Sequence, residues 1–195
     1  MKFVNLPNWI TLIRIPLLFV IGGFFYASFP GSITLAFIVY VLAGITDWLD
    51  GYLARKYNQT SELGKLLDAL NDKIFTVGIF ILLIGKHLVP LWGVFCVLLI
   101  VCREFLVTGL RIIAAKSGSI LAAENLGKVK TVLQIVVMGS FLLIEMLKID
   151  GARWFPASWL VGLTYLNYVN LVVTTGLTAY SGSSYLIKYR YLCSL

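Results

Sequence analysis

Long apolar segments alternate with short polar connections along the whole chain. An α-helix needs about 20 mostly apolar residues to cross the hydrocarbon core of a bilayer. Segments of this kind predict six transmembrane helices, over about Trp9–Phe29, Ile33–Tyr57, Ser61–Ile84, Leu91–Ala115, Ala123–Leu147 and Trp159–Ile187. We therefore expect an all-α integral membrane protein that forms a single domain over residues 1–195.

Composition supports lipid as the main solvent of this chain. Apolar residues make up 59% and charged residues 13% of the sequence, whereas a soluble domain carries about 25% charge. The net charge of +7 could indicate nucleic-acid binding. Because the basic residues lie between apolar segments, we instead expect contact with anionic lipid and no nucleic-acid partner.

The predicted connections differ in charge between the two sides of the membrane. One side carries Lys2, Arg55, Lys56, Lys65, Lys116, Lys128, Lys130, Lys188 and Arg190, and the other carries Lys86, Lys148, Asp150 and Arg153. Cytoplasmic connections of membrane proteins are enriched in Lys and Arg. Both termini are therefore expected in the cytoplasm, and Trp154 and Trp159 fit an aromatic belt on the opposite side.

Four of the nine acidic residues lie close together, at the end of the second predicted helix and the start of the third. Asp47 and Asp50 are three residues apart, and Asp68 and Asp72 are four apart. Each pair therefore shares a helical face. A short connection makes the two helices antiparallel neighbours, so we expect the acidic faces to meet near the cytoplasmic side.

Clustered carboxylates need a counter-charge, because they cannot all stay ionised at close range without cations. Oxygen ligands favour hard metal ions such as Mg²⁺, Mn²⁺ or Ca²⁺. Room for two ions suggests a two-metal site, in which the metals bind phosphoryl oxygens and stabilise a leaving phosphate. Small residues at Gly51, Ala54 and Gly64 would let a ligand approach the backbone, and Arg55 could neutralise phosphate. Helix packing alone is an alternative explanation for Gly51 and Gly64.

The whole acidic segment resembles the signature of the CDP-alcohol phosphatidyltransferase family, D-x-x-D-G-x-x-A-R-x8-G-x-x-x-D-x-x-x-D. The fixed positions are Asp47, Asp50, Gly51, Ala54, Arg55, Gly64, Asp68 and Asp72. The resemblance implies that an alcohol attacks the β-phosphate of CDP-diacylglycerol and releases CMP. It also implies that Asp47, Asp50 and Asp68 hold two Mg²⁺ or Mn²⁺ ions with help from Asp72, which acts as the general base.

The same resemblance indicates which residues bind the donor, CDP-diacylglycerol, and which alcohol is the acceptor. Residues expected to bind CDP-diacylglycerol are Asn8, Thr11, Gly51, Ala54, Arg55 and Gly64. Further segments are similar to bacterial phosphatidylglycerophosphate synthases, namely Pro7–Arg14, Arg103–Phe105, Thr108–Arg111, Gly127–Thr131 and Ser181–Tyr185. A departure is Ala69-Leu70-Asn71, where these synthases usually have Pro-x-Ala. The resemblance implies sn-glycerol 3-phosphate as the acceptor, a homodimer, and a location in the bacterial inner membrane.

A phosphorylated acceptor needs cations that a neutral alcohol does not. Arg103 and Arg111 are eight residues apart, which is about two helical turns, and Lys128 and Lys130 begin the next helix on the same side. With Arg14 they could bind the phosphate of glycerol 3-phosphate. An ion pair between Arg103 and Glu104 is a structural alternative, and the lysines could act only as topology anchors.

Three other functions stay open at this point. A cardiolipin synthase of the same family would use phosphatidylglycerol as its acceptor, and another member would use an inositol phosphate. A divalent-cation transporter is a different class, because aspartates in membrane helices also line ion paths. The aspartates lie at one side of the predicted membrane beside Arg55, which favours an enzyme.

Overall fold

The computed structural model describes residues 6–56, 62–116, 125–151 and 154–188, and within them the chain forms six α-helices. Their bounds are α1 Leu6–Tyr26, α2 Ser32–Lys56, α3 Glu62–Gly85, α4 Leu91–Lys116, α5 Asn125–Ile149 and α6 Ala157–Lys188. The prediction of six helices is therefore confirmed, and each predicted end lies within three residues of the helix end.

The first helix differs most from its predicted range, because it begins and ends three residues earlier. Proline suits the first turn of a helix, where its missing N–H is not needed, so α1 can begin at Leu6, just before Pro7. At the other end, Phe29 precedes Pro30, and a residue before proline avoids the helical region. The chain therefore leaves the helix before it reaches this pair.

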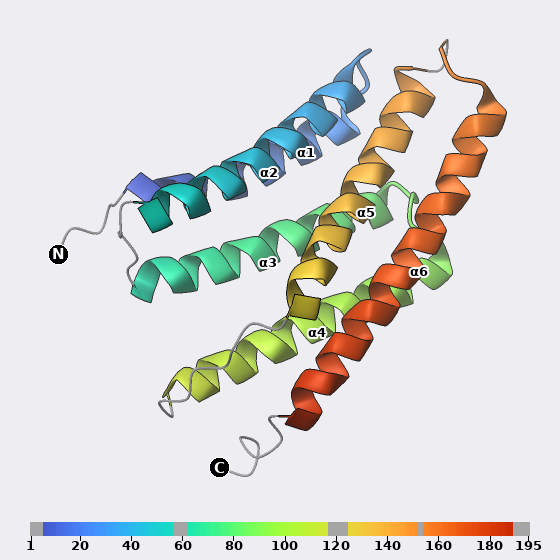
Figure 1. The fold of residues 1–195 in the computed structure, drawn as a ribbon. Coiled ribbons are helices and arrows are strands. Elements are labelled where there is room, and N and C mark those ends of the chain that lie inside the picture. The colour runs from blue at the N-terminus through green and yellow to red at the C-terminus, as the bar shows by residue number, and fades with distance from the viewer. Residues whose placement is uncertain (1–5, 57–61, 117–124, 152–153, 189–195) are drawn as a thin grey trace.

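Successive helices run back and forth, so that the helix ends gather at two ends of the bundle (Figure 1). We call the end with the start of α1, the end of α2 and the start of α3 the site end. Helix α1 packs against α2 and α3, and α5 packs against α2 and α6. Helix α4 packs mainly against α6, whereas α3 makes only light contact with α4 and α5.

Within the described residues, three of the helices are long and apolar enough to cross a membrane. They cover Leu91–Ile112, Gly127–Ile149 and Ala157–Lys188, and shorter apolar helices cover Ile13–Tyr26 and Ser32–Asp47. Large aromatic side chains such as Phe25 and Phe80 are fully buried between the helices. Others point outward, and Phe19 is 74% exposed, as expected where lipid replaces water. These features describe an all-helical membrane protein.

The connection after α5 caps the start of α2 at the end opposite to the site. The Asp150 carboxylate accepts hydrogen bonds from the backbone N–H groups of Gly31 (3.0 Å) and Thr34 (2.9 Å) and from the Thr34 hydroxyl (2.7 Å). Burial acts to raise the pKa of Asp150, but these hydrogen bonds outweigh it and hold the pKa below its usual value. Gly31 has a φ of 85°, which other residues rarely adopt.

This cap predicts a pH-dependent contribution to stability. Asp150→Asn should lower the free energy of unfolding at neutral pH by about 1 kcal/mol, because a hydrogen bond to a charged group contributes about that much more than one to a neutral amide. Because the native pKa is depressed, the wild-type advantage should be complete above the ordinary aspartate range. It should then shrink as the pH falls through the native pKa. Denaturant unfolding in detergent micelles at several pH values measures the difference.

Glu145→Gln is the matched control, because Glu145 is another carboxylate near the same end of α5. Its stability difference from the wild type should not follow the pH profile of Asp150→Asn. A difference for Asp150→Asn that stays constant down to acidic pH would contradict a role for the ionised cap.

Candidate active site

A buried arginine joins the two halves of the acidic motif. Arg14 of α1 is 4% exposed, and its guanidinium pairs with the Asp47 carboxylate of α2. The second terminal nitrogen lies 3.9 Å from Asp72 Oδ1 on α3. The guanidinium also lies 5.0 Å from the centre of the Phe75 ring. A residue of α1 thus links Asp47 of α2 to Asp72 of α3.

Aromatic residues hold this arrangement in place. The Phe75 ring stacks on Tyr40 of α2, with ring centroids 6.1 Å apart. The Tyr40 hydroxyl donates a hydrogen bond of 2.8 Å to the carbonyl of Ile135 on α5. A buried phenol that finds an acceptor contributes apolar contact without leaving a polar group unpaired. Four helices therefore fix the surroundings of Arg14.

A cavity of about 360 Å³ opens beside this ion group. Its charged lining comes from Arg14, Asp47 and Asp72, and its remaining wall is mostly apolar. The other lining residues are Tyr40, Val41, Gly44, Ile45, Phe75, Thr76, Ile135 and Met138. A cavity with charges on one part and apolar walls on the rest suits a ligand that has a polar head and an apolar tail.

The described part of the site is compatible with a hard metal ion. Asp47 and Asp72 line one cavity, and their side chains are 35% and 38% exposed, so their oxygens remain accessible to a ligand. Carboxylate oxygens are the donors that Mg²⁺ prefers. Among the described residues, no three His, Cys, Asp or Glu side chains come together as a metal site. Asp50 and Asp68 lie one helical turn from Asp47 and Asp72 along α2 and α3.

Eight predicted metal-site and donor-site residues lie outside the part of the chain whose side chains the structure describes. They are Asn8, Thr11, Asp50, Gly51, Ala54, Arg55, Gly64 and Asp68. Their backbones belong to α1, α2 and α3, as the sequence predicts. Their roles in metal and CDP-diacylglycerol binding stay predictions.

A second ion group surrounds the buried Glu104 of α4. Its Oε2 lies 2.7 Å from the Lys73 ammonium of α3. Its Oε1 pairs with Lys130 of α5, lies 3.4 Å from Arg103 Nη1 and accepts a hydrogen bond of 3.3 Å from Gln134. We call Glu104 and these four residues the Glu104 cluster. Both oxygens of a carboxylate with a 7% exposed side chain are therefore satisfied.

Helix α6 holds the two predicted arginines of α4. Arg103 Nη2 donates a hydrogen bond of 3.0 Å to the Ser181 hydroxyl. Arg111 Nε donates to the Tyr185 hydroxyl at 3.4 Å, and its guanidinium carbon lies 5.6 Å from the Tyr185 ring centre. Gly182 leaves space for the Arg103 side chain, because a Cβ atom at position 182 would lie 2.6 Å from Arg103 Cγ.

The structure brings together some of the predicted acceptor residues and separates others. Arg103 and Lys130 meet at Glu104, which fits the predicted basic pocket. Arg111 is exposed beside Tyr185, and Lys128 is exposed near the start of α5. Arg14 lies with the aspartates instead.

Sequence reasoning missed Lys73 as a site residue and treated Glu104 only as a partner of Arg103. Lys73 links the two ion groups, because its ammonium also lies 3.7 Å from Asp72 Oδ2. Its position directly after Asp72, inside a predicted membrane helix, was a signal that could have identified it.

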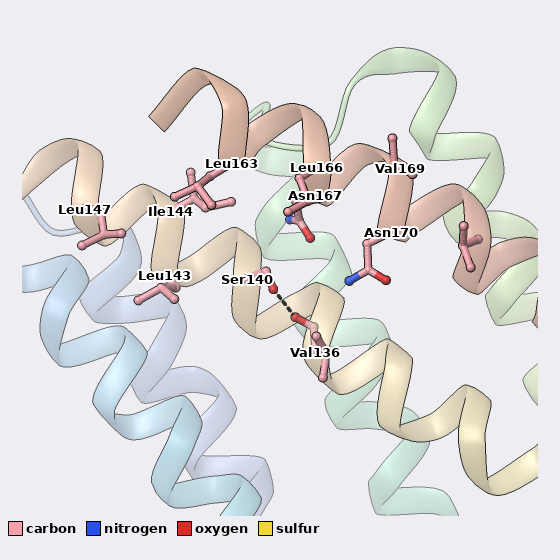
Figure 2. Close-up of a pocket in the computed structure, with 11 residues that line it drawn as sticks. Val136, Ser140, Leu143, Ile144, Leu147, Leu163, Leu166, Asn167, Val169 and Asn170 are labelled. Carbon is pink, nitrogen blue, oxygen red and sulfur yellow. Dashed lines mark hydrogen bonds between the residues drawn. The ribbon is translucent and has the colours of Figure 1, made fainter. Parts of the chain in front are cut away.

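A larger cavity, of about 530 Å³, lies between α5 and α6 (Figure 2). Its lining is mostly apolar, with side chains such as Leu143, Ile144 and Leu166, and it includes the amides of Asn167 and Asn170. It contains no predicted site residue and no charged group. Size alone therefore does not identify the reactive site of this protein.

Comparisons with known proteins agree with the motif. The family profile described as CDP-alcohol phosphatidyltransferase matches residues 4–176. The chain is similar to proteins named CDP-diacylglycerol–glycerol-3-phosphate 3-phosphatidyltransferase. The relative from Bacillus subtilis (strain 168) is 40% identical over 151 residues, which cover 71% of this chain and 77% of the relative. The relative from Rickettsia bellii (strain RML369-C) is 36% identical over 181 residues, which cover 93% of both chains.

The close contact at Gly182 generates a stability prediction. Gly182→Ala should destabilise the protein by about 1 kcal/mol or more, because overpacking typically costs 1–3 kcal/mol and the gain in helix propensity is smaller. Gly176→Ala is the matched control on α6, because a Cβ there meets nothing within 4 Å. The control should leave stability unchanged or raise it, as measured by thermal unfolding in detergent. Equal effects of both changes would contradict the close packing of Arg103 on Gly182.

Proposed function

Because the chain belongs to the CDP-alcohol phosphatidyltransferase family, we propose that it transfers the phosphatidyl group of CDP-diacylglycerol to sn-glycerol 3-phosphate. The products are phosphatidylglycerophosphate and CMP, and the reaction is a step of phospholipid biosynthesis. The names of the similar proteins state this activity. The observation that carries the proposal is the pairing of an acidic cavity with a neighbouring cluster of cations, joined through Asp72 and Lys73.

The acidic cavity is the donor half of the proposed site. Its apolar walls can accept part of the diacylglycerol, while Asp47 and Asp72 lie at the polar lining. Asp47, Asp50, Asp68 and Asp72 would hold one or two Mg²⁺ or Mn²⁺ ions, which when bound supply positive charge to the pyrophosphate. Arg14 keeps the Asp47 and Asp72 carboxylates oriented from α1, because it contacts both. Gly51, Ala54, Arg55 and Gly64 complete the proposed contacts to the CDP group.

Asp72 is the proposed general base. Its carboxylate takes the proton from the attacking hydroxyl of the acceptor, and the hydroxyl oxygen forms a bond to the β-phosphorus. The bond from this phosphorus to the bridging oxygen then breaks, and CMP leaves with that oxygen. A carboxylate surrounded by cations is a weak base, so its effect depends on position within hydrogen-bonding reach of the hydroxyl. The 38% exposure of Asp72 leaves room for that approach.

The Glu104 cluster and Arg111 are the proposed acceptor half. Arg103 and Lys130 converge from α4 and α5 on one carboxylate, and the arginines are oriented by Ser181 and Tyr185 of α6. Arginine can bind phosphate oxygens in a bidentate manner. A dianionic acceptor explains this concentration of positive charge better than a neutral alcohol does. Lys128 is close in sequence and exposed, so it can add long-range attraction.

The proposed topology has six membrane spans, with both termini and the active site on the cytoplasmic side of the inner membrane. Asp47, Asp72 and Lys130 all lie toward the site end of their helices, which is also the end rich in Lys and Arg. Such charge asymmetry favours a cytoplasmic location. Glycerol 3-phosphate and Mg²⁺ are available there. A homodimer is part of the proposal on the basis of family resemblance.

An acceptor panel tests the activity. Purified protein with CDP-diacylglycerol and Mg²⁺ in detergent micelles should release CMP when glycerol 3-phosphate is added, measured by chromatography. Phosphatidylglycerol or inositol phosphate should support far less release. EDTA should stop the reaction, and excess Mg²⁺ should restore it. Folded protein that releases no CMP with any of the three acceptors would rule out the proposed transferase, and release with another acceptor alone would reassign the substrate.

Substitution of the proposed base, Asp72, distinguishes an effect on the transfer reaction from an effect on CDP-diacylglycerol binding. Asp72→Asn should abolish measurable CMP release, because general-base catalysis typically contributes 10²–10⁴-fold. CDP-diacylglycerol should still bind, and its stabilising effect on the thermal melting temperature measures this binding. Glu145→Gln serves as the control carboxylate at the opposite end of the bundle. Substantial turnover by Asp72→Asn would exclude Asp72 as the base.

A further inference from the structure

Lys73 occupies the point at which the donor and acceptor halves of the site meet. Its ammonium lies 3.7 Å from Asp72 Oδ2 and 2.7 Å from Glu104 Oε2. The side chain is 14% exposed, so it is neither a surface anchor nor fully enclosed. A positive charge in this position, inside a helix with an apolar second half, needs a functional or structural explanation.

Charge balance argues against a purely structural explanation. Three cations, Lys73, Arg103 and Lys130, surround the single carboxylate of Glu104. A buried charge is costly unless it is compensated, so a structural network would be expected to match its cations with anions. Lys73 also lies 3.7 Å from Asp72, so in the printed contacts of the described residues three cations share two carboxylates, and positive charge still exceeds negative charge by about one. A phosphate monoester carries about −1.5 to −2 at neutral pH and therefore has the sign that this cluster would attract.

The geometry of Glu104 orients the lysines toward a shared ligand. Lys73 pairs with Oε2, whereas Lys130 pairs with Oε1. The two ammonium groups therefore approach from α3 and α5 and are anchored to opposite oxygens of one carboxylate. Each lysine has three N–H donors, so a contact to one Glu104 oxygen leaves others for a phosphate. Arg103 approaches from α4 and is held from the other side by Ser181.

We propose that Lys73 binds the phosphate of the acceptor together with Arg103 and Lys130, and that Glu104 is the positioning residue of these three cations. This inference rests on the proposed function and adds to it a specificity residue next to the base. Because Asp72 and Lys73 are consecutive, one turn of α3 presents both the proton acceptor and a phosphate contact. A small acceptor with its hydroxyl and phosphate on one glycerol can reach both.

Steady-state kinetics of Lys73→Gln test the proposal. CMP release by the full chain in detergent micelles is measured over a range of glycerol 3-phosphate, then over a range of CDP-diacylglycerol. The KM for glycerol 3-phosphate should rise about tenfold or more, the effect of losing one charge-assisted hydrogen bond. The KM for CDP-diacylglycerol should stay within about twofold, and Lys73→Arg should recover part of the loss. Competitive inhibition by inorganic phosphate should weaken by a factor similar to the change in KM.

Lys148→Gln is the matched control, because Lys148 lies in the last turn of α5 at the opposite end of the bundle and is exposed. Its kinetics should equal those of the wild type. Glu104→Gln should raise the KM for glycerol 3-phosphate selectively. Because loss of a buried carboxylate among cations can prevent folding, its melting temperature is measured first and Lys73→Gln carries the test.

Two results would overturn the role of Lys73. One is an unchanged KM for glycerol 3-phosphate in Lys73→Gln, and the other is an equal loss for both substrates. Failure of the proposed function has a different signature, because the wild-type protein itself would then release no CMP with glycerol 3-phosphate.

Discussion

Charged groups inside an apolar bundle must be paired, and this requirement organises the site end of the protein. Positive and negative side chains alternate from Asp47 to Arg14, Asp72, Lys73 and Glu104. Glu104 then connects to Lys130 and Arg103, and Arg103 connects to Ser181. This path includes residues of all six helices. Breaking a buried ion pair, such as that of Lys73 and Glu104, typically costs about 3–5 kcal/mol, so these pairs help to define how the helices are arranged.

The same pairing bears on the proposed reaction, in which one site takes two substrates of like charge. The cavity with Asp47 and Asp72 suits a metal-bound nucleotide lipid, whereas the Glu104 cluster suits a free phosphate. Carboxylates outnumber cations around Arg14, whereas cations outnumber carboxylates around Glu104, and the two groups touch at Asp72 and Lys73. In the proposed reaction the metal ions would lie at the first group and the acceptor phosphate at the second.

The helical fold followed closely from the sequence, because the length of apolar segments and the positions of proline and polar turns are local properties. The motif likewise indicated the acidic helices from spacing alone. What could not be predicted depends on packing between distant segments. Arg14 was expected near the acceptor, yet it pairs with Asp47, because α1 packs against both α2 and α3. The Glu104 cluster needed the positions of α3, α4 and α5 relative to one another, which no periodicity supplies.

Two contacts in the bundle, that of α2 with α5 and that of α3 with α4 and α5, are stabilised by different interactions. We call each of them a seam. Helices α2 and α5 pack against each other and are joined by Tyr40 at mid-length and by the Asp150 cap at the far end. These contacts connect α2 to α5 and to the connection after it at two separate levels of the bundle. Helix α3 makes only light contact with α4 and α5, and the bond from Lys73 to Glu104 crosses that seam. Because apolar packing across that seam is light, the position of α3 beside α4 depends on the charge of Lys73, so one side chain affects both the local electrostatics and the alignment of two helices.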